Sequence, residues 1–158
     1  MNPARYSFTV KSSATRNRLV SPCSVYKAWA PDSETTQPPR RQFNALWDTG
    51  ATNSMITSQA VAELGLETGG YTRVHHVQGT TDEVPFYFVN LVLFSNFHFP
   101  DVAVVLGELT DTDVLIGMDI VNRGDFAVSN KNGGTTFSFR IPSVEDFDFV
   151  KEDEKYSH

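Results

Sequence analysis

A single aspartate, Asp48, stands where an apolar run stops and a turn begins. It opens Asp48-Thr49-Gly50 and directly follows Ala45-Leu46-Trp47. The apolar run is typical of a buried strand, and aspartate and glycine end such a strand by favouring a turn. A carboxylate at this position is supported by apolar residues and can face a cleft. It can take a proton as a general base or, when protonated, donate one as a general acid.

A short Asp-Thr-Gly also has a simpler interpretation, in which the aspartate hydrogen-bonds its own turn. The residues around the motif favour the catalytic interpretation, since apolar residues precede it and Ala51 follows it. A given tetrapeptide such as Asp-Thr-Gly-Ala arises by chance roughly once per thousand chains of this length. The required apolar flanks make a chance match rarer still.

Two segments of the chain resemble one known family, the retroviral-type or retropepsin-like aspartic peptidases, in its cellular and bacterial branch. ALWDTGATNSMI, at residues 45–56, resembles the active-site loop of these enzymes. VLIG, at residues 114–117, resembles the family's apolar strand that lies beside the catalytic loop and precedes a short helix. The resemblance spans residues 42–141. It implies an all-β, retropepsin-like closed fold, half of an acid-protease barrel with one or two short helices, assembled as a two-fold symmetric homodimer.

The same resemblance implies roles for the residues at matching positions. Asp48 would be the catalytic acid and base, and Thr49 would hydrogen-bond across the two-fold axis to the loop of the other chain. Gly50 would let the substrate backbone approach. Ala51 would keep the wall of the site small, and Ser54 would hydrogen-bond the outer oxygen of the catalytic carboxylate.

Further roles follow for the second motif and for the hairpin that closes over the substrate. Ile116 and Gly117 would support the catalytic loop, and Ile116 would also border a subsite. The flap hairpin is expected near residues 74–84, with three residues that contact the substrate: Val77, Gly79 and Thr80.

One pair of positions departs from the viral enzymes. The viral enzymes carry an aspartate and an arginine that pair with each other, at the positions where this chain has Thr52 and Met118. Both partners of that ion pair are missing together, which affects the expected dimer contacts more than the expected activity.

The chemistry itself requires two aspartates. Hydrolysis of a peptide bond without a metal or covalent intermediate needs one carboxylate to take a proton from water and one carboxylic acid to polarise the carbonyl. The chain contains a single Asp-Thr-Gly, and one Asp48 cannot do both. Two facing carboxylates cannot both ionise cheaply, so the pair keeps one proton and supplies both functions. We therefore expect a homodimer, a polypeptide substrate bound as an added strand, and no cofactor or metal.

Length and charge place limits on the domain organisation and partners. A chain of 158 residues suits one hydrophobic core. The net charge is −6, and residues 145–155 contain six acidic and two basic residues, which argues against nucleic-acid binding. We expect an N-terminal extension with strands and a Pro-rich loop (1–40), a protease domain (41–142) and an acidic, disordered tail (143–158).

The expected location is cytoplasmic, without contact with a membrane. The first residues lack the apolar region of a secretory signal, and no stretch has the length needed to span a bilayer. A single cysteine, Cys23, cannot form a disulfide within the chain, which fits a reducing compartment.

The pattern of apolar residues and turn signals predicts a mostly β chain with few helices. A short helix is expected over residues 58–64, capped by Thr57 or Ser58 and ended by Gly65, and a helical turn over 118–122, closed by Gly124. Residues 84–94 should form a long strand covered on both sides. The other expected strands are 6–10, 25–29, 42–47, 102–106, 114–116, 126–129 and 135–141, the last two joined by a turn at 132–134.

Several other residues have simpler interpretations than a catalytic one. His75 and His76 are adjacent in an expected strand, so they point to opposite faces and are better explained as surface or flap residues than as metal ligands. Asp113 and Asp119 flank the second motif, and Asp119 stands where helix capping is the usual role. Cys23 is better explained as a buried thiol than as a nucleophile.

Two alternatives to a homodimeric peptidase stay open. The chain could be a non-catalytic module that keeps the fold for dimerisation or peptide binding, because fold alone does not establish activity. It could also pair with a different chain.

Overall fold

The computed structural model describes residues 4–75, 81–93 and 97–154, and most of these lie in strands. In chain order the strands are β1 (Tyr6–Lys11), β2 (Leu19–Lys27), β3 (Arg41–Trp47), β4 (Met55–Ile56), β5 (Gly70–His75), β6 (Thr81–Leu93), β7 (Phe97–Leu106), β8 (Val114–Ile116), β9 (Asp125–Ser129) and β10 (Thr136–Ile141). The helical segments are α1 (Ser58–Leu64), α2 (Met118–Val121), α3 (Phe149–Glu154) and the 3-10 turn η2 (Lys131–Gly133).

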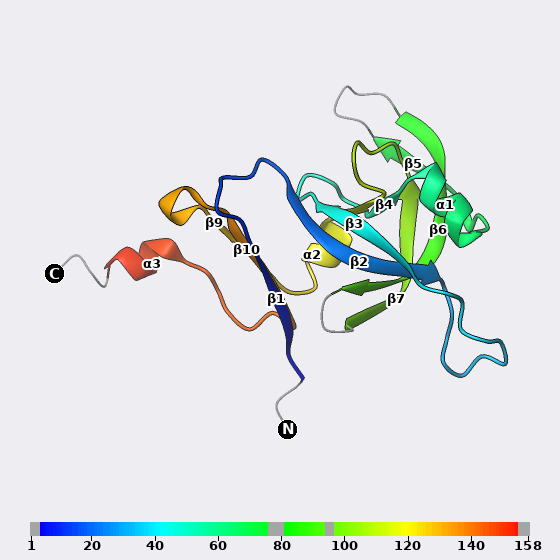
Figure 1. The fold of residues 1–158 in the computed structure, drawn as a ribbon, viewed down its shortest axis with the longest axis horizontal. Coiled ribbons are helices and arrows are strands. Elements are labelled where there is room, and N and C mark those ends of the chain that lie inside the picture. Colours follow the sequence, from blue (N-terminus) through cyan, green and yellow to red (C-terminus); the bar gives the residue numbers. More distant parts are fainter. Residues whose placement is uncertain (1–3, 76–80, 94–96, 155–158) are drawn as a thin grey trace.

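Six strands close into a ring. Their order is β2-β3-β8-β4-β7-β6, and β2 pairs again with β6 to complete the circuit (Figure 1). A closed ring leaves none of its members as a free edge, which protects their backbone groups. The predicted all-β closed fold is confirmed.

The interior of the ring is apolar. β8 is buried along its whole length, and it lies between two strands: it pairs in parallel with β3 and antiparallel with β4. Each large side chain buried in this way stabilises the fold by about 1.5–3 kcal/mol. The largest apolar side chains that are fully buried are Val25, Ile56, Val89, Phe99, Ile116 and Ile120.

A second sheet, β1-β10-β9, lies against one side of the ring (Figure 1). Aromatic rings join the two: Trp47 at the end of β3 stacks on Phe126 of β9, with centroids 5.6 Å apart, and also contacts Phe8, Phe137 and Phe139. Such pairs add about 0.5–1.5 kcal/mol each beyond the area that they bury. Residues 1–40 therefore contribute β1 to this sheet and β2 to the ring.

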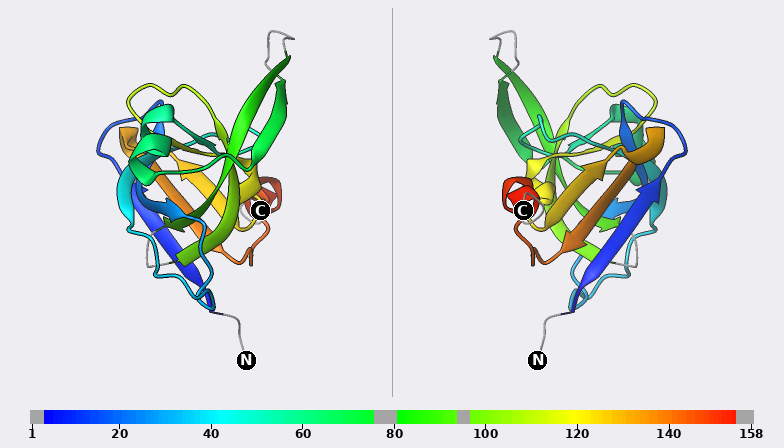
Figure 2. Two further views of the ribbon diagram at one scale, coloured as in Figure 1. Left: turned by 90° about the vertical axis from the view of Figure 1, so that its right-hand side faces the viewer. Right: turned by 90° about the vertical axis from the view of Figure 1, so that its left-hand side faces the viewer.

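The hairpin of β5 and β6 extends beyond the ring as a two-stranded arm (Figure 2). The first half of β6 belongs to this arm and is exposed or half-buried, whereas Val89 to Leu93 are buried in the ring. The prediction that this strand is covered on both sides is thus correct for its second half only. Phe88, at the junction, is 45% exposed.

Two strands begin earlier than predicted, and each contains a proline in the part that the prediction left out. β2 starts at Leu19 and runs through Pro22, and β7 starts at Phe97 and runs through Pro100. Proline lowers the expectation of a strand because it cannot donate to the ladder. In both cases the strand continues in spite of this.

The short helices agree only in part with the predictions. α1 begins after its cap Thr57 and ends at Gly65, as predicted, and Gly65 has the left-handed conformation. α2 ends with Asn122 as its C-cap, so the prediction that Gly124 closes this helical turn is wrong. A Cβ at Gly124 would overlap the carbonyl oxygen of Arg140, which makes close approach the reason for glycine here.

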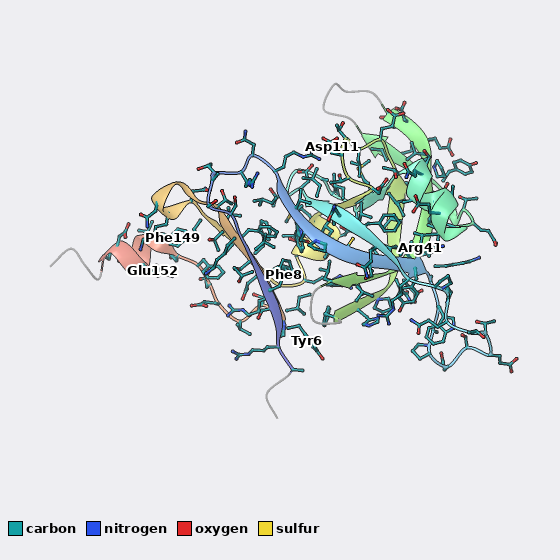
Figure 3. The ribbon with its side chains drawn as sticks, in the orientation of Figure 1. Tyr6, Phe8, Arg41, Asp111, Phe149 and Glu152 are labelled. Atoms are coloured by element: carbon teal, nitrogen blue, oxygen red, sulfur yellow. The ribbon has the colours of Figure 1, made fainter. Side chains whose placement is uncertain are left out.

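The acidic tail, for which disorder is predicted, contains α3. This helix has no buried residue, and Phe149 and Glu152 lie at one end of the molecule, away from the ring (Figure 3). Among the described residues, no helix has the length and apolar character needed to cross a membrane.

Candidate active site

Asp48 lies at the end of β3, on the loop that leads to β4. Its amide donates to the carbonyl of Ile116 at 3.0 Å, and its Oδ1 accepts from the amide of Gly50 at 2.8 Å. Asp48 is half-buried, while Thr49 and Gly50 are exposed. The side chain thus closes its own turn and remains accessible at the surface.

The second motif holds this loop from beneath. β3 and β8 pair in parallel, with Trp47 opposite Ile116. At the start of α2, the amide of Met118 donates to the carbonyl of Ala51 at 2.8 Å, and the amide of Asp119 donates to that of Thr52 at 3.2 Å. Both donors belong to the first turn of a helix, which has no intrahelical acceptors for them.

Gly117 makes this approach possible. A Cβ at this position would lie 2.6 Å from the carbonyl carbon and 2.7 Å from the carbonyl oxygen of Asn53. The backbone of Gly117 is extended, so glycine is required here for space and not for an unusual conformation. The supporting role predicted for Gly117 is thus explained by its contact with the loop.

Ser54 has a different partner from the one predicted. Its buried hydroxyl donates to Oδ1 of Asp119 at 2.8 Å and accepts from the amide of Gly117 at 3.1 Å. The predicted hydrogen bond to the outer oxygen of Asp48 is therefore wrong for this chain: the serine joins the two motifs to each other. Asp119 also accepts from the amide of Ile120, while the cap position of α2 is occupied by Gly117.

The Ser54–Asp119 pair is the feature of the site that the sequence did not reveal. The two residues are 65 positions apart, and neither has a local pattern that names the other. The only available signal was that each lies in one of two motifs expected to meet.

The other candidate residues have structural roles. Asp113 accepts a hydrogen bond from the Thr57 hydroxyl at 2.7 Å and so supports the cap of α1. Burial raises the pKa of the Cys23 thiol to about 12, which keeps it protonated and unreactive. Ile116 is fully buried, so it supports the loop from the core and does not border a subsite as predicted.

Two cavities flank the loop. One of about 360 Å³ lies on the side of the β5–β6 arm and is lined by Gly50, Ala51, Thr52, Asn53, Met55, Arg73, Val74 and Val105. The other, of about 390 Å³, lies on the side of β9 and is lined by Asn17, Arg18, Leu19, Leu46, Trp47, Asp48, Thr49, Phe126 and Val128. Both volumes are in the range of ligand sites. The loop thus presents Asp48 and Thr49 on one side and residues 50–53 on the other.

The flap candidates Val77, Gly79 and Thr80, as well as His76, lie outside the described residues. Strand β5 reaches His75 and pairs with β6 up to Thr81, so the described parts of both strands lead toward the predicted flap. Within the described ranges, no group of histidine, cysteine, aspartate and glutamate could hold a metal ion.

A family model described as “gag-polyprotein putative aspartyl protease” matches residues 39–123, a range that includes both motifs. The chain belongs to this family. In this gag-type aspartyl protease family member, the Asp-Thr-Gly loop comes first in the matched range and the supporting second motif follows it. No curated protein matches the sequence.

Solved structures similar to this aspartyl protease family member include a retropepsin-like aspartic protease from Rickettsia conorii. The two share 13% sequence identity with a TM-score of 0.53, over 87% of this chain and 95% of the other, which establishes a common fold. A protease of EIAV, complexed with the inhibitor HBY-793, shares 20% identity with a TM-score of 0.46, over 69% of this chain and 92% of the other.

Proposed function

We propose that this protein is an aspartic endopeptidase whose active site contains two copies of Asp48, one from each chain of a homodimer. The observation that carries the proposal is the position of Asp48. It stands at the end of a core strand, on a loop fixed by the second motif, with Thr49 exposed beside it. Thr49 would hydrogen-bond the loop of the other chain, and Gly50 would admit the substrate backbone.

The proposed reaction needs only water and the two carboxyl groups. The ionised carboxylate takes a proton from water, and the water oxygen attacks the peptide carbonyl carbon while the protonated carboxyl donates its proton to the carbonyl oxygen. A tetrahedral diol results. The carbon–nitrogen bond then breaks as the nitrogen receives a proton from one carboxyl and the other carboxyl takes back the diol proton. The pair ends with one shared proton, as it began.

The face for the second copy is supported by the cavity of about 390 Å³. This cavity continues from Asp48 and Thr49 onto Phe126 and Val128 of β9. β9 is an edge of the sheet β1-β10-β9, and Val128 is 44% exposed. An edge strand presents unpaired backbone groups that a second strand can use. We propose that two chains meet along β9, so that the two copies of Asp48 face each other.

The substrate would be an extended polypeptide between the loop and the β5–β6 arm. The cavity of about 360 Å³ lies between them and would receive side chains of the bound peptide. We propose Val77, Gly79 and Thr80 as the residues that cover the peptide, with residues 41–142, β1 and β2 forming the catalytic unit.

The proposed location is cytoplasmic. The one cysteine is a buried free thiol, which supports this location because a reducing compartment keeps thiols unpaired.

A digest of an unfolded protein tests the activity, with wild type compared to Asp48→Asn. The matched control is Asp32→Asn, in the exposed loop between β2 and β3. We expect wild type and Asp32→Asn to cleave, and Asp48→Asn to lose a factor of about 10²–10⁴ or more. The asparagine can still accept from the Gly50 amide, so circular dichroism should show an unchanged fold. Equal cleavage by all three proteins would assign the activity to a contaminant and favour a non-catalytic module.

A further inference from the structure

Among the described residues, one charged side chain lines the cavity between the loop and the arm. Of the residues that line it, Arg73 alone carries a charge, and the others are apolar, glycine or neutral polar side chains. Arg73 is exposed and lies on β5, the strand of the arm that faces solvent on one edge. In the described part of the chain, one positive charge therefore borders a lining that is otherwise neutral.

The guanidinium of Arg73 is not used by the fold. Its register partner across the β5–β6 ladder is Glu83, yet no ion pair joins the two. Within the described residues no hydrogen bond or ion pair of the Arg73 side chain is formed. By contrast, Arg18 pairs with Asp111 and Arg140 with Asp125. The donors of Arg73 remain available to a ligand in the cavity.

We propose that Arg73 selects peptides with an acidic side chain at the substrate position that enters this cavity. This inference rests on the proposed peptidase function and names its preferred substrate. The planar guanidinium matches a carboxylate with two parallel hydrogen bonds, which an amide of the same shape cannot reproduce with equal strength. A bound peptide also displaces water from the cavity, so the attraction is stronger than at an open surface.

The preference is confined to one position of the peptide and its same-face neighbours. Successive side chains of an extended strand point to opposite faces, so the residues directly before and after the selected one face away from Arg73. Asp48 lines the other cavity and residues 50–53 line this one, so the selected position is near the cleaved bond but is not the reacting carbonyl.

The experiment uses a series of extended apolar peptides that are capped at both ends. Each carries one glutamate, glutamine or lysine at a single position around the cleaved bond. The enzymes are wild type, Arg73→Gln, Arg73→Glu and the control Arg41→Gln, whose arginine lies at the far end of β3 from Asp48 and is labelled in Figure 3. Cleavage is measured as kcat/KM for each peptide.

Wild type and Arg41→Gln should prefer glutamate over glutamine by about tenfold at one position, which corresponds to about 1.4 kcal/mol. Arg73→Gln should lose this preference, and Arg73→Glu should prefer lysine at the same position. Added salt should weaken the wild-type preference, because the pair is partly open to solvent. Equal kcat/KM for the three peptides with wild type would overturn the inference and leave the peptidase function intact.

Two further measurements separate the remaining outcomes. First, binding is measured with the Asp48→Asn variant, which should not cleave the peptides. The Kd for the glutamate peptide should remain about tenfold lower than that for the glutamine peptide. If wild type cleaves none of the peptides but still binds the glutamate peptide more tightly, the peptidase function is refuted and Arg73 remains a carboxylate-binding residue. Glutamine peptides with a free terminal carboxylate should bind no better than capped ones. If they match the glutamate peptide, the site recognises a chain end and the proposal is wrong.

Discussion

The loop that carries Asp48 and the β5–β6 arm face each other across one cavity, but they are held in different ways. The loop receives hydrogen bonds from the Gly117, Met118 and Asp119 amides, and its Ser54 bonds to Asp119. Within the described residues, the outer strand β5 of the arm pairs with β6 alone, and its Tyr71 is 63% exposed. Figure 2 shows the arm standing clear of the ring.

This difference separates two tasks. A carboxylate must be held in place before the reaction, because a misplacement of about 1 Å can lower the rate about 10²-fold. A two-stranded arm with few buried contacts opens at low cost in free energy, which suits a segment that must admit and cover a peptide. Substitutions in the loop should therefore lower kcat and stability together, while those in the arm should change KM or specificity alone.

The largest effect is expected from Gly117→Ala. The new methyl group meets the backbone of Asn53, which cannot rotate away, so the loop must shift. We expect a loss of about 2–3 kcal/mol in the free energy of unfolding and about a 10²-fold loss in kcat. Urea unfolding and peptide cleavage measure the two. The control is Gly107→Ala, whose methyl group would meet only the flexible end of Met55 and should have a smaller effect. Similar results for both glycines would contradict the account of the loop.

A smaller loss is expected from Ser54→Ala. The substitution leaves the Gly117 amide without its buried acceptor and removes a donor to Asp119, at a cost of about 1–3 kcal/mol. A double-mutant cycle with Asp119→Ala should give a coupling of about 0.5 kcal/mol or more. Additive effects in urea unfolding would mean that the pair does not join the two motifs.

A buried carboxylate, Asp125 at the start of β9, lines neither of the two cavities and is held by hydrogen bonds from its neighbours. Burial raises the pKa of Asp125, but hydrogen bonds from Ser143, from the amide of Val144 and from Arg140 outweigh this and lower it to about 2. The pKa of an aspartate in an unfolded chain is about 3.9. The ionised carboxylate therefore contributes stability in full above about pH 4, and this contribution is lost as the pH falls through about 2.

Asp125→Asn tests this by its pH dependence. The difference in free energy of unfolding between wild type and variant should be largest above about pH 4 and should shrink as the pH falls toward about 2. Chemical unfolding at a series of pH values measures it. A difference that grows on acidification would have the wrong sign for a lowered pKa.

The smallest effect on stability is expected from Val74→Ala in the arm. Val74 is half-buried and lines the cavity, so its truncation should change the free energy of unfolding by less than about 1 kcal/mol. KM should rise a few-fold with kcat unchanged, because only contact with bound peptide is lost. If Val74→Ala lowers kcat and stability as much as Gly117→Ala, the two regions do not divide the tasks.

Features set by neighbouring residues could be predicted from the sequence. The Asp-Thr-Gly turn, the cap at Thr57 and the left-handed Gly65 each depend on a few adjacent side chains. Features set by distant contacts could not. The β2–β6 pairing that closes the ring and the Ser54–Asp119 bond join segments more than sixty positions apart. Arg73 lies beside the loop because of how the β5–β6 arm is placed in the fold, which its neighbours in the sequence do not determine.

The central claim is that each active site needs Asp48 from both chains, and mixing wild-type and Asp48→Asn chains tests it most directly. After exchange of subunits, the activity per wild-type and variant chain together is measured against the wild-type fraction. If two copies of Asp48 form one site, mixed dimers are inactive and the activity falls with the square of that fraction, to about a quarter in an equal mixture. A linear fall, to about half in the equal mixture, would mean that one Asp48 suffices and would contradict the account.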